Sequence, residues 1–116
     1  MQYTRKFQTM ADHARAQLNE VSPEDVDAHL ANGAIALDIR DKEEHDAGHI
    51  NGSLNISRGK LEMLIEGKVE DMETTILCYC NANNRGALSA VALKNMGYTN
   101  ATFIAGGLNG YKKLKG

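Results

Sequence analysis

The sequence predicts an α/β domain built on a parallel sheet. Short apolar runs alternate along the chain with segments that have helical spacing or helix-capping residues. Parallel neighbours need crossover connections, and the helices that make those connections cover both faces of the sheet. The 116 residues, 42% of them hydrophobic, are enough for one core. We therefore expect a compact doubly wound parallel sheet with helices on both faces.

The predicted strands are four runs that are too short for helices. They are rich in apolar residues and are bounded by glycine, charged or turn-forming residues, as is typical of strands in a buried sheet. The β-branched and aromatic residues of the third run make it the most strand-prone. The four predicted strands are residues 34–39, 53–56, 75–79 and 102–104.

Capping residues and glycines place the helices between these strands. Ser22 is expected to cap a helix that has Pro23 at its first position and ends at Gly33. Gly67 and Gly97 are expected to close two later helices, because glycine is the preferred residue just beyond a helix. The predicted helices are residues 4–18, 23–32, 41–47, 60–66, about 86–96 and a short C-terminal segment after Gly107.

Residues 4–18 form only a weakly amphipathic helix ahead of the main pattern. We therefore divide the chain into an N-terminal helical extension, residues 1–19, and the main domain, residues 20–116. The extension is a candidate surface for a partner or a second copy, and we expect a monomer or a weak homodimer.

The balance of charge argues against several partners. Thirteen basic and 15 acidic residues are spread along the chain and give a net charge of -2, so neither nucleic acid nor an anionic membrane is expected to bind. No apolar run approaches the ~20 residues of a membrane span, and the N-terminus lacks the apolar region of a secretory signal. With two closely spaced cysteines and no disulfide framework, we expect a cytoplasmic protein.

Two loops that follow strands, residues 38–50 and 80–86, are the expected place for chemistry. Ligands of parallel sheets bind beyond the carboxyl ends of the strands. Cys80 ends a strand, and a helix is predicted to begin a few residues later. Inward-pointing N–H groups and the helix dipole would hold an anion there, and such settings lower the pKa of a thiol and make it a nucleophile.

The neighbours of Cys80 fit this interpretation. Three asparagines follow it, and asparagine tolerates left-handed and turn backbone. Arg85 offers a planar fork of donors to an oxyanion. Each feature has an ordinary alternative: a buried cysteine, a turn, a solvated arginine. The combination favours a functional loop, with Cys78 left inside the strand as a core residue.

The segment Cys80–Arg85, which reads CNANNR, resembles the catalytic loop Cys-x-x-x-x-Arg of the rhodanese family. A second match is Asp38-Ile39-Arg40, Glu44, Gly48-His49-Ile50 and Gly52. A third is the stretch 106–111, where tyrosine replaces the tryptophan of the family's closing motif. Together the three motifs extend the resemblance over about residues 20–116.

The resemblance implies a sulfurtransferase that uses no metal or organic cofactor. Cys80 would take a sulfur atom from thiosulfate or polysulfide as a persulfide and pass it to a thiol, cyanide or a protein. The implied substrate-binding residues are Asn81, Ala82, Asn83, Asn84, Arg85, Gly86 and, from a segment similar to relatives that act on polysulfide, Arg58.

The other charged residues are expected to be structural. The resemblance gives Asp38, Arg40, Glu44 and His49 the role of shaping the fold beside the site, and their spacing matches no common zinc motif. His13, His29 and His45 are expected on solvated faces.

The sequence departs from the family pattern in three places and leaves two other functions open. His45 replaces an aromatic residue, Asn51 a proline, and Gly86 a serine or threonine. The loop also lacks the extra basic residue of many thiosulfate-using members, so the physiological donor stays open. One alternative is a binding or sulfur-relay module without turnover. Another is a phosphatase or arsenate reductase, but those relatives have one residue more between cysteine and arginine.

Overall fold

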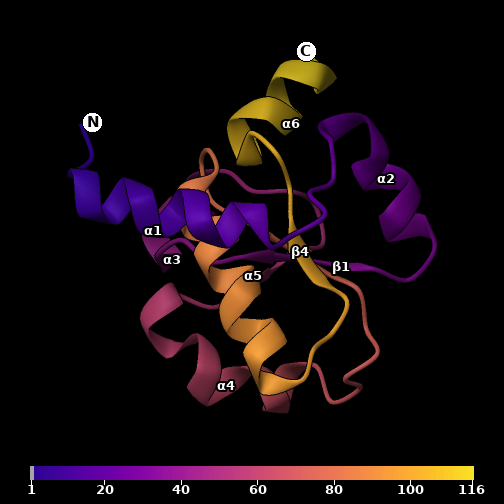
Figure 1. Ribbon diagram of the computed structural model, residues 1–116. Coiled ribbons are helices and arrows are strands. Elements are labelled where there is room, and N and C mark those ends of the chain that lie inside the picture. The colour runs from indigo at the N-terminus through magenta and orange to yellow at the C-terminus, as the bar shows by residue number, and fades with distance from the viewer. Residues whose placement is uncertain (1) are drawn as a thin grey trace.

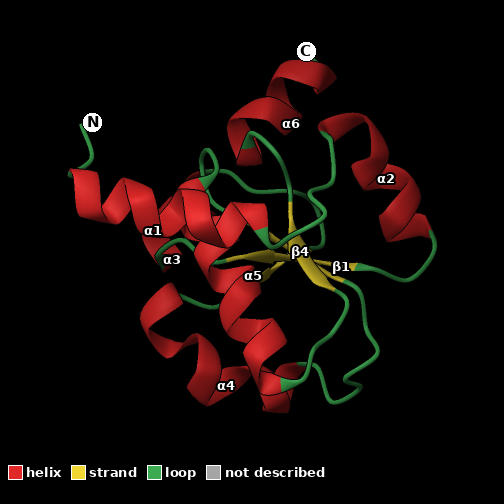
Figure 2. Ribbon diagram, in the orientation of Figure 1, coloured by secondary structure: helices red, strands yellow, loops and turns green. Residues whose placement is uncertain are grey.

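The computed structural model describes residues 2–116 and contains a four-stranded sheet, so Met1 of the predicted extension lies outside the described residues. All neighbouring strands are parallel and their order is β2-β1-β3-β4. Figure 2 shows the strands at the centre of the molecule with helices around them. The predicted parallel sheet is confirmed. Its strands are β1 (Ile35–Asp38), β2 (Leu54–Asn55), β3 (Ile76–Tyr79) and β4 (Ala101–Phe103).

Helices cover both faces of the sheet, as predicted. One core cluster joins the sheet to α1, α4 and α5, and a second joins the opposite face to α2 and α6. None of the described helices has both the length and the apolar composition that a membrane span requires. The helices are α1 (Arg5–Ala16), α2 (Pro23–Ala31), α3 (Lys42–Ala47), α4 (Leu61–Lys68), α5 (Asn84–Met96) and α6 (Gly107–Lys115), with a 3-10 turn, η1 (Arg58–Lys60).

The central strand β3 is buried on both faces, which explains its continuous apolar sequence. Successive side chains of a strand point to opposite faces. Cys78 therefore belongs to the cluster under α5, whereas Leu77 and Tyr79 belong to the cluster under α2 and α6. All three are fully buried. The prediction that Cys78 is a core residue is confirmed.

Three helix ends differ by two residues from the predicted positions. Helix α1 ends at Ala16 instead of Leu18, α4 continues through Gly67 to Lys68, and α5 begins at Asn84 where a start at about Gly86 is predicted. A glycine inside a helix costs about 1 kcal/mol relative to alanine. In α4 the burial of Leu61 and Ile65 against the sheet outweighs that cost. The earlier start of α5 places Arg85 in the first turn of a helix.

The cap at the start of α2 also differs from the expected one. Ser22 occupies the N-cap position, but its hydroxyl donates to the Asp25 carboxylate, 3.1 Å away, and accepts no bond from a helix N–H. Gly33 and Gly97 end their helices in the predicted way, since both have a positive φ.

Helix α1 packs on the domain. Figure 1 shows α1 lying across α5, and Ala11 and Ala14 of α1 are buried. The amides of Gln8 and Asn84 exchange two hydrogen bonds of 3.1 and 3.2 Å, which join α1 to the first turn of α5. The predicted extension therefore lies against the helix that follows the cysteine loop.

The burial of Cys78 leads to a prediction about stability. Cys78→Ala removes a fully buried sulfur from the core cluster, so the free energy of unfolding should fall by about 1–2 kcal/mol. Urea denaturation followed by circular dichroism measures the change. Met63→Ala, at an exposed position of α4, is the control and should leave the midpoint unchanged. An unchanged midpoint for Cys78→Ala would contradict the assigned packing.

Candidate functional site

Cys80 lies at the point where the strand order reverses. The chain passes from β1 to β2 on one side, while β3 lies on the other side of β1. Asp38 at the end of β1 is in register with Tyr79 at the end of β3. The loops that follow these two strands therefore meet at the carboxyl edge of the sheet, where parallel sheets bind ligands. This is the edge that the sequence predicts for the site.

A cavity of about 520 Å³ opens beside Cys80. The residue is 3% exposed, so its sulfur is more enclosed than the sequence suggests. Both cysteines are free thiols. Burial raises the pKa of the Cys78 thiol far above its usual value, which leaves that residue a core group. The cavity is lined by Tyr3, Phe7, Glu44, Cys80, Asn81, Ala82 and Arg85.

The first turn of α6 fixes the direction of the peptides after Cys80. The N–H of Leu108 donates to the carbonyl of Cys80 at 2.8 Å, and the N–H of Asn109 donates to that of Asn81 at 3.1 Å. In a trans peptide the N–H points away from its carbonyl. The N–H groups of Asn81 and Ala82 therefore point away from α6.

Backbone donors remain available in the loop that carries the sulfur. The N–H of Gly86 donates to Cys80 Sγ at 3.4 Å. Within residues 2–116, no backbone N–H of residues 81–85 donates to any acceptor. Unpaired N–H groups in a tight strand-to-helix connection can bind an anion. This loop can therefore stabilise negative charge on sulfur.

The asparagines of the loop act through their side chains, and none of them has a left-handed backbone. Among the described residues, only glycines have a positive φ. Asn81 Oδ1 accepts from Arg40 Nη1 at 3.0 Å, and Asn83 Oδ1 accepts from the N–H of Gly106 at 2.8 Å. Asn84 makes the pair with α1. Each amide ties the loop to a different part of the fold.

Gly107 packs so closely against the backbone of the cysteine loop that position 107 has no room for a side chain. Its φ is +56°, and a Cβ there would lie 2.4 Å from the carbonyl oxygen of Cys80 and 2.5 Å from that of Ala82. Glycine is the residue that allows such an approach of two backbones. The third sequence motif therefore supports the cysteine loop from behind.

An ion pair spans the cavity. Arg85 Nη1 and Nη2 each lie 3.3 Å from an oxygen of Glu44, and Asn81 Nδ2 donates to the same carboxylate at 3.4 Å. The hydrogen bonds from Arg85 lower the pKa of Glu44 below its usual value, so this group is ionised at neutral pH. The sequence-based interpretation placed Glu44 only among the fold-shaping residues, whereas the structure places it in the cavity wall.

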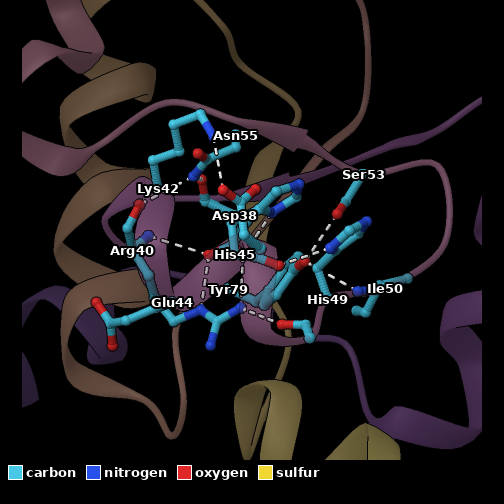
Figure 3. Close-up of polar contacts among 12 residues, drawn as sticks. Asp38, Arg40, Lys42, Glu44, His45, His49, Ile50, Ser53, Asn55 and Tyr79 are labelled. Atoms are coloured by element: carbon cyan, nitrogen blue, oxygen red, sulfur yellow. Dashed lines mark hydrogen bonds and ion pairs between the residues drawn. The ribbon is translucent and has the colours of Figure 1, made fainter.

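A buried carboxylate holds the loop after β1, as Figure 3 shows. Asp38 accepts from Arg40 Nε at 2.9 Å and from Arg40 Nη2 at 2.7 Å, and His45 Nδ1 lies 2.9 Å from it. Burial alone would raise the pKa of Asp38, but the hydrogen bonds from Arg40 and His45 outweigh it and lower that pKa. These contacts agree with the expected structural role of Asp38 and Arg40.

The histidine expectations hold in part. His13 and His29 are exposed, as predicted. For His45 the prediction is wrong: its side chain is 14% exposed, and its ring stacks on His49 with the centroids 3.7 Å apart. A planar imidazole fills the place of the family's aromatic residue, and its nitrogen adds a bond to the buried carboxylate.

The structure does not bring every predicted site residue to the cavity. Arg58 lies in η1, outside the lining, and pairs with Glu62 at 2.8 Å. Asn83, Asn84 and Gly86 stabilise the loop without lining the cavity. Tyr3 and Phe7 also line the cavity, which the sequence does not indicate, because helical spacing does not tell which element a helix face will contact. Among residues 2–116, no three His, Cys, Asp or Glu side chains lie together as a metal site.

A cysteine after the central parallel strand, an N–H donor at its sulfur and an arginine in the next helical turn define an α/β domain with a cysteine loop at the carboxyl edge of its sheet. Residues 22–114 match the family described as the rhodanese-like domain. The chain therefore belongs to the rhodanese-like domain family.

Curated relatives carry sulfurtransferase names. The chain is 32% identical over 92 residues to thiosulfate sulfurtransferase GlpE of Pseudomonas entomophila, covering 79% of this chain and 83% of that protein. It is 33% identical over 82 residues to thiosulfate sulfurtransferase PspE of Escherichia coli, covering 69% and 78%. These names support a rhodanese-type transferase at the level of the family.

Solved structures share the fold. A Rhodopseudomonas palustris protein of unknown function, described as a possible tyrosine phosphatase, has a TM-score of 0.85 and 27% identity, covering 100% of this chain and 96% of its own. The human single-domain sulfurtransferase TSTD1 has a TM-score of 0.72 and 26% identity, covering 81% and 95%.

The contact behind the loop can be tested by adding one methyl group. Gly107→Ala would place a Cβ against the carbonyls of Cys80 and Ala82, so the free energy of unfolding should fall by more than ~2 kcal/mol. The displaced loop should also change the alkylation rate of Cys80 by iodoacetamide. Gly59→Ala is the matched control, since nothing lies within 4 Å of its Cβ position. Equal stability of the two variants would refute this role of Gly107.

Proposed function

We propose that this protein is a sulfurtransferase that carries sulfane sulfur as a persulfide on Cys80. The observation that carries the proposal is the supply of N–H groups in the cysteine loop: Gly86 donates to Sγ, and the N–H groups of residues 81–85 have no acceptor in the described chain. Membership in the rhodanese-like family and the names of the GlpE and PspE relatives support it.

The reaction has two displacement steps at sulfur. The Cys80 thiolate attacks the outer sulfur of thiosulfate or polysulfide, a new S–S bond forms, and the donor's S–S bond breaks. Its electron pair leaves with sulfite or with the shortened polysulfide. A thiolate or cyanide then attacks the outer sulfur of the persulfide, and the electron pair of the broken bond returns to Cys80. No external oxidant or reductant is needed.

The loop stabilises the charge that moves between these states. The terminal sulfur of a persulfide is anionic, and fixed N–H dipoles stabilise such charge without having to reorient. Asn81, Ala82, Asn83, Asn84 and Gly86 provide this ring in our proposal. Arg85 faces the same cavity and assists the anionic donor or its leaving group.

Glu44 weakens the attraction of the site for anions. It holds Arg85 in an ion pair across the cavity, so the two charges of the lining cancel. A dianion such as thiosulfate must compete with this carboxylate for the guanidinium. The charge balance therefore makes Glu44 a determinant of donor choice, together with the missing extra basic residue of the loop.

A phosphatase is the second candidate, because the Rhodopseudomonas palustris structure is described as a possible tyrosine phosphatase. Only four residues separate Cys80 from Arg85. The phosphatase relatives have one residue more, so this ring should suit one sulfur atom better than a tetrahedral oxyanion. A binding or relay module is the third candidate and would show no independent turnover.

Thiocyanate formation from cyanide and either thiosulfate or polysulfide tests the proposal. Cys80→Ser should abolish turnover with an unchanged circular dichroism spectrum, because a hydroxyl cannot form the persulfide. Cys78→Ala, the matched control on the same strand, should retain turnover. Hydrolysis of p-nitrophenyl phosphate should be negligible. Robust phosphatase turnover would favour the second candidate, and no transfer by the folded protein would favour the binding module.

The ion pair across the cavity predicts opposite changes of the KM for thiosulfate when either of its two partners is replaced. Glu44→Gln frees Arg85, so the KM for thiosulfate should fall severalfold, whereas Arg85→Ala should raise it by about tenfold. Arg85→Ala should lower activity more than thermal stability. Glu62→Gln, which breaks the ion pair with Arg58 outside the cavity, is the control and should leave the KM unchanged. A KM that does not respond to Glu44→Gln would exclude Glu44 as a determinant of donor choice.

A further inference from the structure

The cavity beside Cys80 is larger than inorganic sulfur substrates require. Its volume is about 520 Å³. Pockets of about 300–1,000 Å³ are typical of sites that bind small organic molecules. Cyanide and the sulfane sulfur of thiosulfate would fill only a small part of this space. The remaining volume can hold the body of an organic substrate while its sulfur reaches Cys80.

One wall of the cavity comes from outside the family match. Tyr3 and Phe7 belong to the N-terminal segment, whereas the match to the rhodanese-like family begins at residue 22. Their rings lie 5.3 Å apart at an interplanar angle of 42°. Tyr3 is 48% exposed, so part of its apolar surface still faces solvent. Burying such surface under a ligand is favourable.

The helix that carries Phe7 is held in a fixed place. Buried Ala11 and Ala14 pack α1 against α5, and the Gln8–Asn84 amide pair joins it to the first turn of α5. A preorganised side chain loses little conformational entropy when a ligand binds. Phe7 is therefore a fixed part of the cavity wall, and the Tyr3 ring lies against it.

The charges of the cavity favour a substrate with an uncharged body. Glu44 and Arg85 are its only charged lining residues among those described, and they pair with each other. A second anionic group on the substrate would meet the Glu44 carboxylate. An apolar or aromatic group meets Tyr3 and Phe7 without this repulsion.

We infer that the cavity is a subsite for an organic thiol with an uncharged apolar body. Tyr3 and Phe7 bind this body, and the thiol sulfur accepts the outer sulfur atom of the Cys80 persulfide. The inference rests on the proposed function and specifies its acceptor. The acceptor thiolate attacks the outer sulfur of the Cys80 persulfide and forms a new S–S bond. The bond to Cys80 breaks, its electron pair remains on the Cys80 thiolate, and the acceptor leaves as a persulfide anion.

Single-turnover discharge of the persulfide tests this subsite. The full-length protein is loaded with polysulfide, desalted, and mixed with 2-phenylethanethiol, 2-mercaptoethanesulfonate or cyanide, and loss of the persulfide is followed by mass spectrometry. Wild type should react faster with 2-phenylethanethiol than with the anionic thiol. For Phe7→Ala and Tyr3→Ala, the ratio of the 2-phenylethanethiol to the cyanide rate constant should fall by about tenfold, as lost aromatic burial predicts.

Met10→Ala is the matched control on the same helix. Met10 is 60% exposed and lies outside the cavity lining, so both rate constants should stay at the wild-type values. Circular dichroism checks that α1 is retained, and Tyr3→Ala alters an exposed residue ahead of the helix. A loaded protein whose ratio is the same in wild type, Phe7→Ala and Tyr3→Ala would overturn the subsite and leave the proposed function standing. Failure of Cys80 to load would overturn both.

Discussion

The site depends on the contact between the first turn of α6 and the carbonyls of the cysteine loop. Leu108 and Asn109 donate to the carbonyls of Cys80 and Asn81, and Gly107 lets the two backbones meet. Because the peptides are trans, carbonyls turned toward α6 leave the N–H groups facing the other way. A structural constraint at the C-terminus thereby provides donors for an anion at the sulfur.

A second anchor reaches the loop from β1. Asp38 is buried and holds Arg40 through paired hydrogen bonds, and Arg40 in turn donates to Asn81. A buried ion pair with satisfied partners is rigid, and removal of one partner leaves an uncompensated buried charge. The lowered pKa of Asp38 means that this pair stabilises the native state above the ordinary carboxyl pKa, and that the contribution is lost as the pH falls through the lowered value. Loop position and acid stability are thus linked.

Much of the fold and the position of the candidate nucleophile, Cys80, could be predicted from the sequence, because they depend on local patterns. Apolar runs and capping glycines indicate which segments are strands and helices, and the end of a parallel strand indicates where ligands bind. Cys78 and Cys80 could be told apart because one lies inside an apolar run. Gly67 shows the limit of such rules, since tertiary burial kept α4 helical through it.

The rest depends on contacts between distant segments, which local patterns do not contain. The spacing of Phe7 indicates a helix face but not that it meets the cavity, and Glu44 is equally able to face solvent or Arg85. The sequence indicates only that the asparagines suit a turn, whereas in the fold their amides bridge to Arg40, Gly106 and Gln8. His45 Nδ1 lies 2.9 Å from the Asp38 carboxylate, a contact that forms only in the folded chain.

Tandem mass spectrometry of the protein after incubation with polysulfide tests the central claim most directly. The fragments that separate Cys78 from Cys80 should carry one additional sulfur atom on Cys80, and cyanide should remove it. Sulfur on Cys78, or a Cys78–Cys80 disulfide as the resting state, would contradict the single-cysteine mechanism and require a dithiol mechanism instead.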